Sequence, residues 1–232
     1  MNPFSQPKNY DEMLTKIMIF TFVMCLIFVA LVAHIWPALW NLLHPDWLTL
    51  KVDVLGLKDI PAAYIIVAAI ISLAARVSKL HDRVSDVFGI RQRFDISEIL
   101  TPLAGGVGVP VDLARREKLI ANRRAIMGDV FYKYASSTNP EIDTHLIWSA
   151  LDKWSWFWIC IEGTTVALIA DVALVLRHSF QIGAYVGIAM FVGTLVATQV
   201  NRACSSLAHS EVREILKDPK RCADIKLAFD AL

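Results

Sequence analysis

Apolar runs long enough to cross a membrane alternate with polar segments along this chain. Residues 17–33 and 179–201 contain no charged side chain, and each approaches the roughly 20 apolar residues that a helix needs to span hydrocarbon. A shorter run, residues 60–75, ends at Arg76, but the side chains of Arg76 and Lys79 can reach the headgroups and lengthen the usable span. These three runs predict transmembrane helices.

Another apolar run, residues 156–176, is the third in chain order. It begins within a cluster of tryptophans typical of a membrane interface: Trp154, Trp156 and Trp158. The opposite interface would hold Trp36, Trp40 and Trp47. Composition agrees, because 56% of the residues are hydrophobic and the mean hydropathy is +0.49, whereas soluble domains are roughly 45–50% apolar. The predicted fold class is therefore an all-α integral membrane protein with four transmembrane helices, a cytoplasmic helical domain between spans 2 and 3, and a cytoplasmic C-terminal helical tail.

The distribution of Lys and Arg predicts the orientation. Segments 1–16, 76–153 and 200–232 contain 2, 12 and 6 of these residues, whereas loop 37–59 contains two and the turn near residue 177 contains one. Because cytoplasmic loops carry the excess of positive charge, both termini and the middle segment are predicted to be cytoplasmic, in an inner or plasma membrane. The predicted order is cytoplasmic segment 1–16, span 17–36, external loop 37–59, span 60–77, cytoplasmic helical domain 78–153, span 154–176, external turn 177–181, span 182–201 and cytoplasmic helices 202–232.

The first apolar run is too long for a typical signal peptide, and no small-residue cleavage site follows it before Trp36, so we expect it to be retained. The sequence does not predict a disulfide framework, because the four cysteines form no C-x-x-C pair and are expected in spans or on the cytoplasmic side. They are Cys25, Cys160, Cys204 and Cys222. A zinc site built from Cys204, His209 and Cys222 matches no standard spacing. The sequence therefore predicts no metal and no cofactor.

After the second span, apolar residues repeat at steps of three and four: Leu73, Val77, Leu80, Val84, Val87 and Phe88. The spacing predicts that this helix continues into the cytoplasm and stops at Gly89. Asp95 is expected to cap a short helix over residues 96–101, which Pro102 ends. Glycines and prolines are expected to exclude regular structure from residues 102–112. This segment lacks the Lys-Ser/Thr ending of a phosphate-binding loop, so it is predicted to be a hydrophobic hinge or packing loop.

A long helix over residues 112–135 is predicted to begin at the cap Asp112, and another helix, entered at Asp143, to run into the third span. The candidate residues for binding a partner, an anionic ligand or lipid are basic: Arg91, Arg93, Arg115, Arg116, Arg123 and Arg124. A solvated face is one interpretation of this basic set. Attraction to anionic lipids and capture of a phosphate-bearing ligand or an acidic protein are the others. A net charge of +1 offers no support for nucleic-acid binding beyond this patch.

Two patterns point to a homo-oligomer. Residues 48–54 alternate between apolar and polar side chains like a half-buried strand, and because a lone strand is unstable in water, we expect it to pair with a neighbouring subunit or lie at the interface. In the fourth span, Gly183 and Gly187 form G-x-x-x-G, and Gly193 and Ala197 continue the small residues. Such positions permit close helix approach, so they are predicted to serve oligomer packing.

Two carboxylates, Glu162 and Asp171, lie in the third span. A charge near the bilayer centre costs roughly 2.5–3.5 kcal/mol on insertion scales, so such residues usually face a partner, a cavity or a bundle interior. A nine-residue separation puts them on opposite helix faces, roughly 13 Å apart along the axis. Asp171 is expected to pair with Arg177 or His178, or to approach the headgroups. The candidate intramembrane polar or ion path is Glu162, Thr164, Thr165 and Asp171.

Three classes of function remain. The first is an oligomeric inner-membrane sensor or effector, whose cytoplasmic domain couples a protein partner or ligand to the spans and permeabilises the membrane as its output. The second is a small transporter or an ion or proton channel subunit that uses Glu162. An intramembrane enzyme is disfavoured, because no H-E-x-x-H, G-x-S-x-G or comparable motif occurs. Accessory and effector proteins of bacterial antiviral defence share this kind of architecture, which is an association of architecture alone.

Overall fold

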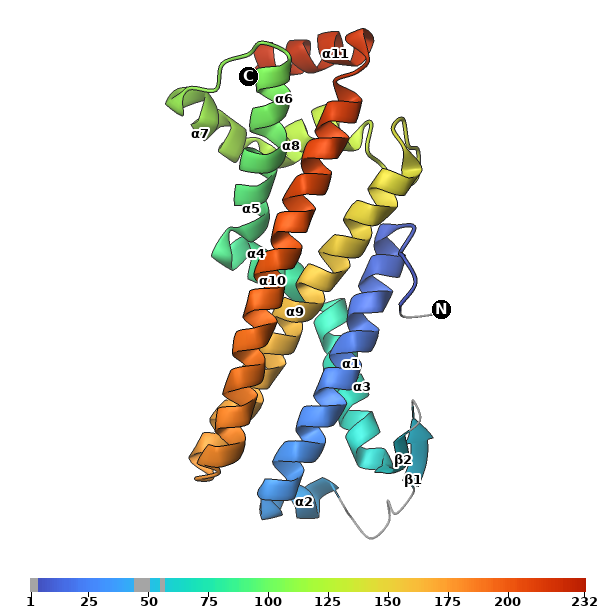
Figure 1. Cartoon of the computed structure of the whole chain (residues 1–232), viewed down its shortest axis with the longest axis vertical. Coiled ribbons are helices and arrows are strands. Elements are labelled where there is room, and N and C mark those ends of the chain that lie inside the picture. Colours follow the sequence, from blue (N-terminus) through green and yellow to red (C-terminus); the bar gives the residue numbers. More distant parts are fainter. Residues whose placement is uncertain (1–3, 44–50, 55–56) are drawn as a thin grey trace. The chain divides into compact units, whose positions relative to one another are not determined.

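The computed structural model describes residues 4–43, 51–54 and 57–232, and it is mostly helical (Figure 1). Its elements in chain order are α1 (Tyr10–Ile35), α2 (Pro37–Leu43), β1 (Lys51–Val54), β2 (Leu57–Pro61), α3 (Ala62–Val77), α4 (Leu80–Phe88), α5 (Ile90–Phe94), η1 (Asp95–Leu100), α6 (Thr101–Gly106), α7 (Leu113–Ala121), α8 (Arg123–Met127), η2 (Gly128–Tyr132), α9 (Thr144–Leu176), α10 (Phe180–Ile215) and α11 (Pro219–Asp230). The segments η1 and η2 are π-helical.

The chain divides into two compact units. The first contains Leu14–Leu80 and Ser155–Gln199 together with the first four residues, and the second contains Ser5–Met13, His81–Trp154 and Val200–Leu232. Helices α1, α9 and α10 therefore contribute residues to both units.

In the first unit, the long helices are apolar enough to cross a membrane. Helices α1, α9 and α10 meet this criterion of length and composition, and α3 with α4 adds a fourth candidate if this bent pair forms one span. Large apolar side chains such as Ile169 of α9 and Phe191 of α10 are exposed. Exposure of this kind suits contact with acyl chains rather than water. The chain is thus compatible with a membrane protein of three spans, or four.

Packing in the first unit has two centres. One joins α1 to α3 through Leu26, Tyr64 and Ala68, and the other joins α9 to α10 through Ala167, Leu174 and Val186. Partly buried side chains of α1 also pack on the second centre. Helices α9 and α10 run antiparallel, joined by a tight turn (Figure 1).

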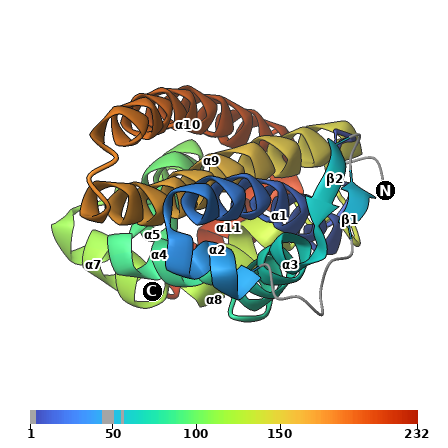
Figure 2. The same cartoon turned by 90° about the horizontal axis from the view of Figure 1, so that it is seen from below.

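The strand predicted within residues 48–54 has a partner in the same chain. Strand β1 pairs antiparallel with β2, with Lys51 opposite Pro61 and Val54 opposite Leu57, and the register shifts between Val52 and Val54. Figure 2 shows this hairpin beside the beginning of α3. The strand therefore has a partner within the chain, which the sequence analysis did not predict, and its pairing with a neighbouring subunit stays a prediction. Residues 47–50, including Trp47, lie outside the described residues.

The helix after the second span is not continuous, contrary to its apolar spacing. It breaks at Ser78 and Lys79, and Lys79 adopts a positive φ of 49°, which no α-helix accommodates. The apolar face that was predicted from this spacing lies at the surface of the chain, since Val77, Val87 and Phe88 are exposed. Gly89 does end α4, in the left-handed conformation with φ 62°.

The segment around Pro102 is helical where a loop was predicted. Pro102 occupies the first turn of α6, where the missing N–H breaks no hydrogen bond, so the helix continues to Gly106. Asp95 caps no helix with its side chain and instead begins η1. Leu103 and Val109 are buried, so the predicted packing role of this segment is confirmed although its predicted conformation is wrong.

The helix that was predicted over residues 112–135 is in fact several pieces. Asp112 caps α7 as expected, because its Oδ1 accepts a hydrogen bond from the Arg115 backbone N–H at 2.7 Å. The helix then breaks at Asn122, which has a non-helical φ and ψ, and η2 follows α8. Asp143 accepts a hydrogen bond from the backbone of His145, and α9 runs from Thr144 into the apolar third run, as predicted.

Substitution by alanine is expected to have opposite effects on stability at two glycines of the second unit. Gly89→Ala should lower the free energy of unfolding by about 1–2 kcal/mol, because an L-residue is strained at φ 62°. Gly128→Ala should raise it by about 0.5–1 kcal/mol, since Gly128 has helical dihedrals and an added Cβ would meet no atom within 4 Å. Thermal unfolding of the full chain in mild detergent measures both. Equal shifts of the two variants would contradict these backbone assignments.

Candidate functional site

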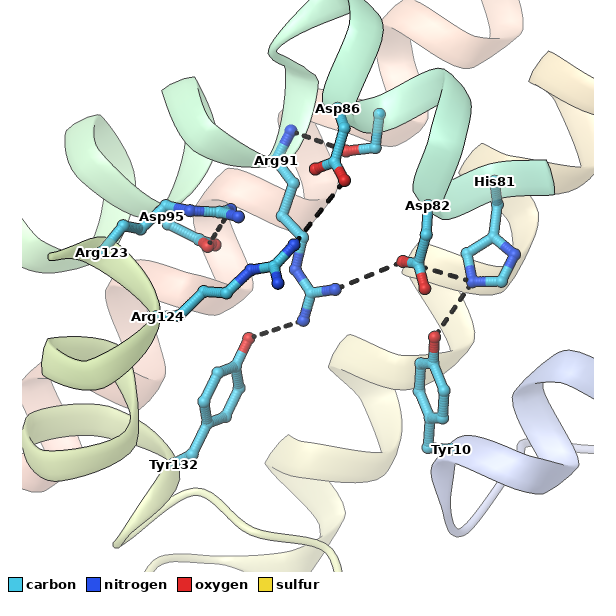
Figure 3. Close-up of polar contacts among 10 residues, drawn as sticks. Tyr10, His81, Asp82, Asp86, Arg91, Asp95, Arg123, Arg124 and Tyr132 are labelled. Carbon is cyan, nitrogen blue, oxygen red and sulfur yellow. Dashed lines mark hydrogen bonds and ion pairs between the residues drawn. The ribbon is translucent and has the colours of Figure 1, made fainter. Parts of the chain in front are cut away.

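Buried polar side chains gather in the second unit where α4, α5, η1 and η2 approach one another (Figure 3). His81, Ser85 and Asp95 are each at most 5% exposed. Burial of such groups is costly unless each is hydrogen-bonded or paired. We call this set the Arg91 network. Hydrogen bonds and ion pairs connect six of its members, Tyr10, His81, Asp82, Ser85, Arg91 and Tyr132, and the ion pair of Asp95 and Arg123 lies beside them.

Arg91 is the centre of this network. Its Nη1 lies 3.4 Å from Oδ1 of Asp82 on α4, its Nη2 donates to the Tyr132 hydroxyl at 3.2 Å, and its backbone N–H donates to Oγ of Ser85 at 3.0 Å (Figure 3). Burial opposes the charge on Arg91, but Tyr132, Asp95 and Asp82 outweigh this effect and raise its pKa. The guanidinium therefore stays charged and ties α4 and α5 to η2.

The network extends from Asp82 to the first residue of α1. His81 Nε2 lies 3.5 Å from Asp82 Oδ1 and 3.0 Å from the Tyr10 hydroxyl oxygen. In a neutral imidazole one nitrogen donates and the other accepts, so Nε2 either donates a proton to these oxygens or accepts one from Tyr10. A change in the position of this proton would alter the contact between α4 and α1.

A buried ion pair forms the other end of the network. Arg123 Nη1 donates to Oδ2 of Asp95 at 2.9 Å. Only 12% of the Arg123 side chain and 7% of the Asp95 side chain is exposed. Burial raises the pKa of Asp95 to about 6, while Arg91 and Arg123 act in the opposite direction. Asp95 begins a π-helical segment, a conformation that often occurs at functional sites.

The six arginines of the predicted basic set do not share one face. Arg91 and Arg123 lie inside the network, and Arg93 donates to the Phe88 carbonyl oxygen at 3.1 Å. Arg115 donates to the Pro110 carbonyl oxygen at 3.2 Å. The exposed members are Arg93, Arg116 and Arg124, of which Arg124 lies 3.7 Å from Asp86. The break at Asn122 explains the separation, because it interrupts the helical spacing that would align these side chains.

In the first unit, Glu162 is buried and finds its partner on another helix. The Thr21 hydroxyl of α1 donates to Glu162 Oε2 at 2.5 Å. Thr165 instead donates to the Ile161 carbonyl oxygen of its own helix. Thr164 faces α10, where its Oγ1 lies 3.2 Å from the position that a Cβ on Gly193 would occupy. The structure therefore joins Glu162 to α1 rather than to its neighbouring threonines.

Asp171 faces α10 rather than its expected partners. Its Oδ1 is buried without a hydrogen-bond partner among the described residues, and it lies 3.0 Å from where a Cβ on Gly183 would be. The Arg177 guanidinium lies over the Trp36 ring, at 5.5 Å from its centroid, instead of pairing with Asp171. His178 has a positive φ of 59° in the turn after α9, and its ring contacts that of Phe180.

The small residues of the fourth apolar run face more than one way. Gly183 and Gly193 bring α10 against α9 of the same chain, and Ala197 is buried. A Cβ on Gly187 would meet nothing within 4 Å. Of the three glycines predicted to serve oligomer packing, only Gly187 thus presents an open surface within the described residues.

Several residues of the Arg91 network were not singled out from the sequence. Tyr10, His81 and Tyr132 belong to distant segments, so no local spacing connects them. Glu211 is also buried, and a local signal exists for it, because it adjoins Val212 within the apolar stripe of Ala208 and Ile215. Over the described part of the chain, no group of three or more His, Cys, Asp or Glu side chains is arranged to hold a metal, and the four cysteines are free.

Comparison with known proteins identifies a family. Residues 9–231 match the model of the YmfE protein family. The uncharacterized protein YmfE of Escherichia coli (strain K12) is 28% identical over 179 residues, which cover 73% of this chain and 70% of that protein. No solved structure matches the chain.

The raised pKa of Asp95 predicts a pH-dependent stability difference between the wild type and Asp95→Asn. Its folded value of about 6 exceeds the ordinary value of 3.8. The wild type should therefore lose stability relative to the variant, on the order of 2 kcal/mol, as the pH rises from about 4 through about 6. Melting temperatures of the two proteins, measured across this pH range, test the expected loss of stability. Asp86→Asn, at an exposed carboxylate of α4, is the matched control and should show no such trend. A difference that is constant with pH would contradict the assignment.

Proposed function

The chain belongs to the YmfE protein family, and we propose that it is an oligomeric inner-membrane sensor or effector. In this proposal its second unit is cytoplasmic and receives a protein partner or ligand. The Arg91 network then passes that event to the membrane helices, and altered permeability of the membrane is the output.

The proposed topology has four spans, with both termini and the middle segment in the cytoplasm. It is supported by the apolar helices α1, α9 and α10, by the candidate pair of α3 and α4, and by the excess of Lys and Arg in the segments assigned to the cytoplasm. The proposed boundaries are those of the apolar runs, 17–36, 60–77, 154–176 and 182–201.

The observation that carries the coupling proposal is the continuity of the Arg91 network. It joins Tyr10, the first residue of a candidate span, to His81, which follows the break after α3, and reaches η2 through Tyr132. The contacts that Arg91 makes with Asp82 and Tyr132 are charge-assisted, and such hydrogen bonds are stronger than neutral ones. A ligand or partner that changes the position of η1 or η2 would therefore bias the ends of two membrane helices at once.

A protein partner is favoured by the surface of α7. Leu113 and Ile120 are exposed apolar residues, and Arg116 is exposed between them. Positions 113, 116 and 120 share one helix face at steps of three and four. A face that combines apolar and basic side chains suits an amphipathic acidic segment of a partner better than water alone.

A channel subunit is the alternative, and the orphaned carboxylate oxygen of Asp171 between α9 and α10 supports it. Buried acids of this kind often mark ion or proton pathways. Ion flux in proteoliposomes that Glu162→Gln abolishes and Arg91→Gln preserves would favour this alternative over coupling through the network. An enzyme remains the least supported class.

Reporter fusions test the topology. Alkaline phosphatase, which is active only outside the cytoplasm, should be active when fused after Leu43 or Ser179, and inactive after Leu80, Met127 or Leu232. A cytoplasmic reporter such as green fluorescent protein fused at the same residues is the matched control, with the reverse pattern expected. Activity of the phosphatase after Met127 would exclude a cytoplasmic second unit.

Loss of Arg91 tests the coupling. Arg91→Gln removes two side-chain contacts, so exchange of backbone hydrogens should accelerate by roughly tenfold or more both in residues 80–94 and in residues 8–13 around Tyr10. Hydrogen–deuterium exchange of the full chain in lipid nanodiscs measures this. Arg83→Gln makes the same charge change at an exposed position of α4 and should leave both segments unaltered. Acceleration confined to residues 80–94 would show that the network carries nothing to α1.

A further inference from the structure

An apolar groove lies between α1 and α3 in the first unit. Its volume is about 380 Å³, and its walls are Met18, Ile19, Phe22, Ala69, Ser72 and Leu73. Neither the Arg91 network nor the buried carboxylates of α9 belong to it. It is a separate hollow between α1, which is long and apolar enough to cross a membrane, and α3, which is a candidate span together with α4.

The walls of the groove offer almost no polar contact. Its one hydroxyl, that of Ser72, is buried and donates to the Ala69 carbonyl oxygen of its own helix at 3.1 Å. Because this donor is already satisfied, an occupant gains only apolar contacts along the groove. An alkyl chain is the ligand class that such walls fit.

A positively charged side chain, Arg76, lies at one end of the groove. Arg76 lies three and four residues beyond Leu73 and Ser72, one turn further along α3. Its Nη1 donates to the Thr15 hydroxyl at 2.9 Å and lies 3.9 Å from Sδ of Met18, a residue of the wall. Both contacts use Nη1, so within the described residues the Nη2 and Nε donors remain for another acceptor. Two parallel donors of a guanidinium match the oxygens of a phosphate.

We propose that this groove binds an anionic phospholipid. One acyl chain lies along Met18, Phe22 and Leu73, and the phosphate accepts hydrogen bonds from Arg76. The cytoplasmic end of α3 would place this phosphate in the inner leaflet, where anionic lipids are attracted by basic residues near the surface. Only the choice of leaflet rests on the proposed topology, because the groove and the guanidinium belong to one compact unit.

Charge decides between this occupant and a second copy of the chain. A helix of another copy lying along the groove would cover Arg76 with apolar side chains, and a buried unpaired charge is strongly unfavourable. A phospholipid instead supplies the apolar chain and the compensating negative charge in one molecule.

Native mass spectrometry of the full chain, released from nanodiscs, counts the lipids that each chain retains. Phosphatidylglycerol and phosphatidylcholine with the same acyl chains are compared. The wild type should retain phosphatidylglycerol preferentially, and Arg76→Gln should lower this retention about fivefold, the effect of one basic residue near the membrane. Arg83→Gln, which removes one charge from an exposed site, should retain as much as the wild type.

Filling the groove tests the acyl-chain site. Ala69→Phe should reduce retention of both lipids, while Ile70→Phe, on an exposed neighbouring position outside the groove, should not. Ala69→Leu, a smaller filler, replaces Ala69→Phe if the latter lowers the melting temperature. Full retention in a folded filler variant overturns the site, and equal retention of the two lipids overturns its anionic selectivity. Loss of oligomer mass with unchanged lipid would assign the groove to a second copy. The number of lipids retained does not depend on the orientation of the chain in the membrane. These measurements therefore test the groove even if the proposed topology is wrong.

Discussion

A polar group that leaves water must find a partner inside the protein, and this constraint organises both units of the chain. In the second unit it pairs the buried Asp95 with Arg123, beside Arg91 and its partners Asp82 and Tyr132. In the first unit it pairs Glu162 with a threonine hydroxyl of another helix. The cost of an unpaired buried charge, several kcal/mol, is large enough to decide these arrangements.

The same constraint makes the contacts within the second unit sensitive to changes in charge. Several of its helices are short and interrupted, with breaks at Gly89 and Asn122 and two π-helical segments. Short helices gain little stability alone, so side-chain contacts between them determine their positions. A network of charges can be rearranged by a proton, an anion or a partner, whereas an apolar core of equal size responds to none of these.

The long apolar helices of the first unit meet the constraint differently at their surface and in their interior. Their exposed side chains are large and apolar, which acyl chains accept without cost. Close approach between α9 and α10 uses Gly183 and Gly193, and it leaves the Asp171 oxygen against a helix backbone. Arg76 stands where the apolar surface ends, so the side chain that limits the second span also supplies a binding group for lipid.

Local sequence determined the features that depend on neighbouring residues alone. The apolar runs, the cap at Asp112, the helix entered at Asp143 and the stop at Gly89 follow from composition and spacing within one or two turns. The helix end predicted at Pro102 is wrong because helix continues through it, and the helix predicted over residues 112–135 instead breaks at Asn122.

Only the tertiary structure decided which side chains meet. Asp95 and Arg123 are 28 residues apart, Tyr10 and His81 are 71 apart, and Thr21 and Glu162 are 141 apart. Periodicity shows that a helix has a face but not which helix covers it. Glu162 was therefore recognised as costly without its partner, and the basic residues appeared as one surface although Arg91 and Arg123 contact acidic and tyrosine side chains of other helices. The physical reason is that burial and pairing depend on the folding of distant segments together, and no short-range pattern records it.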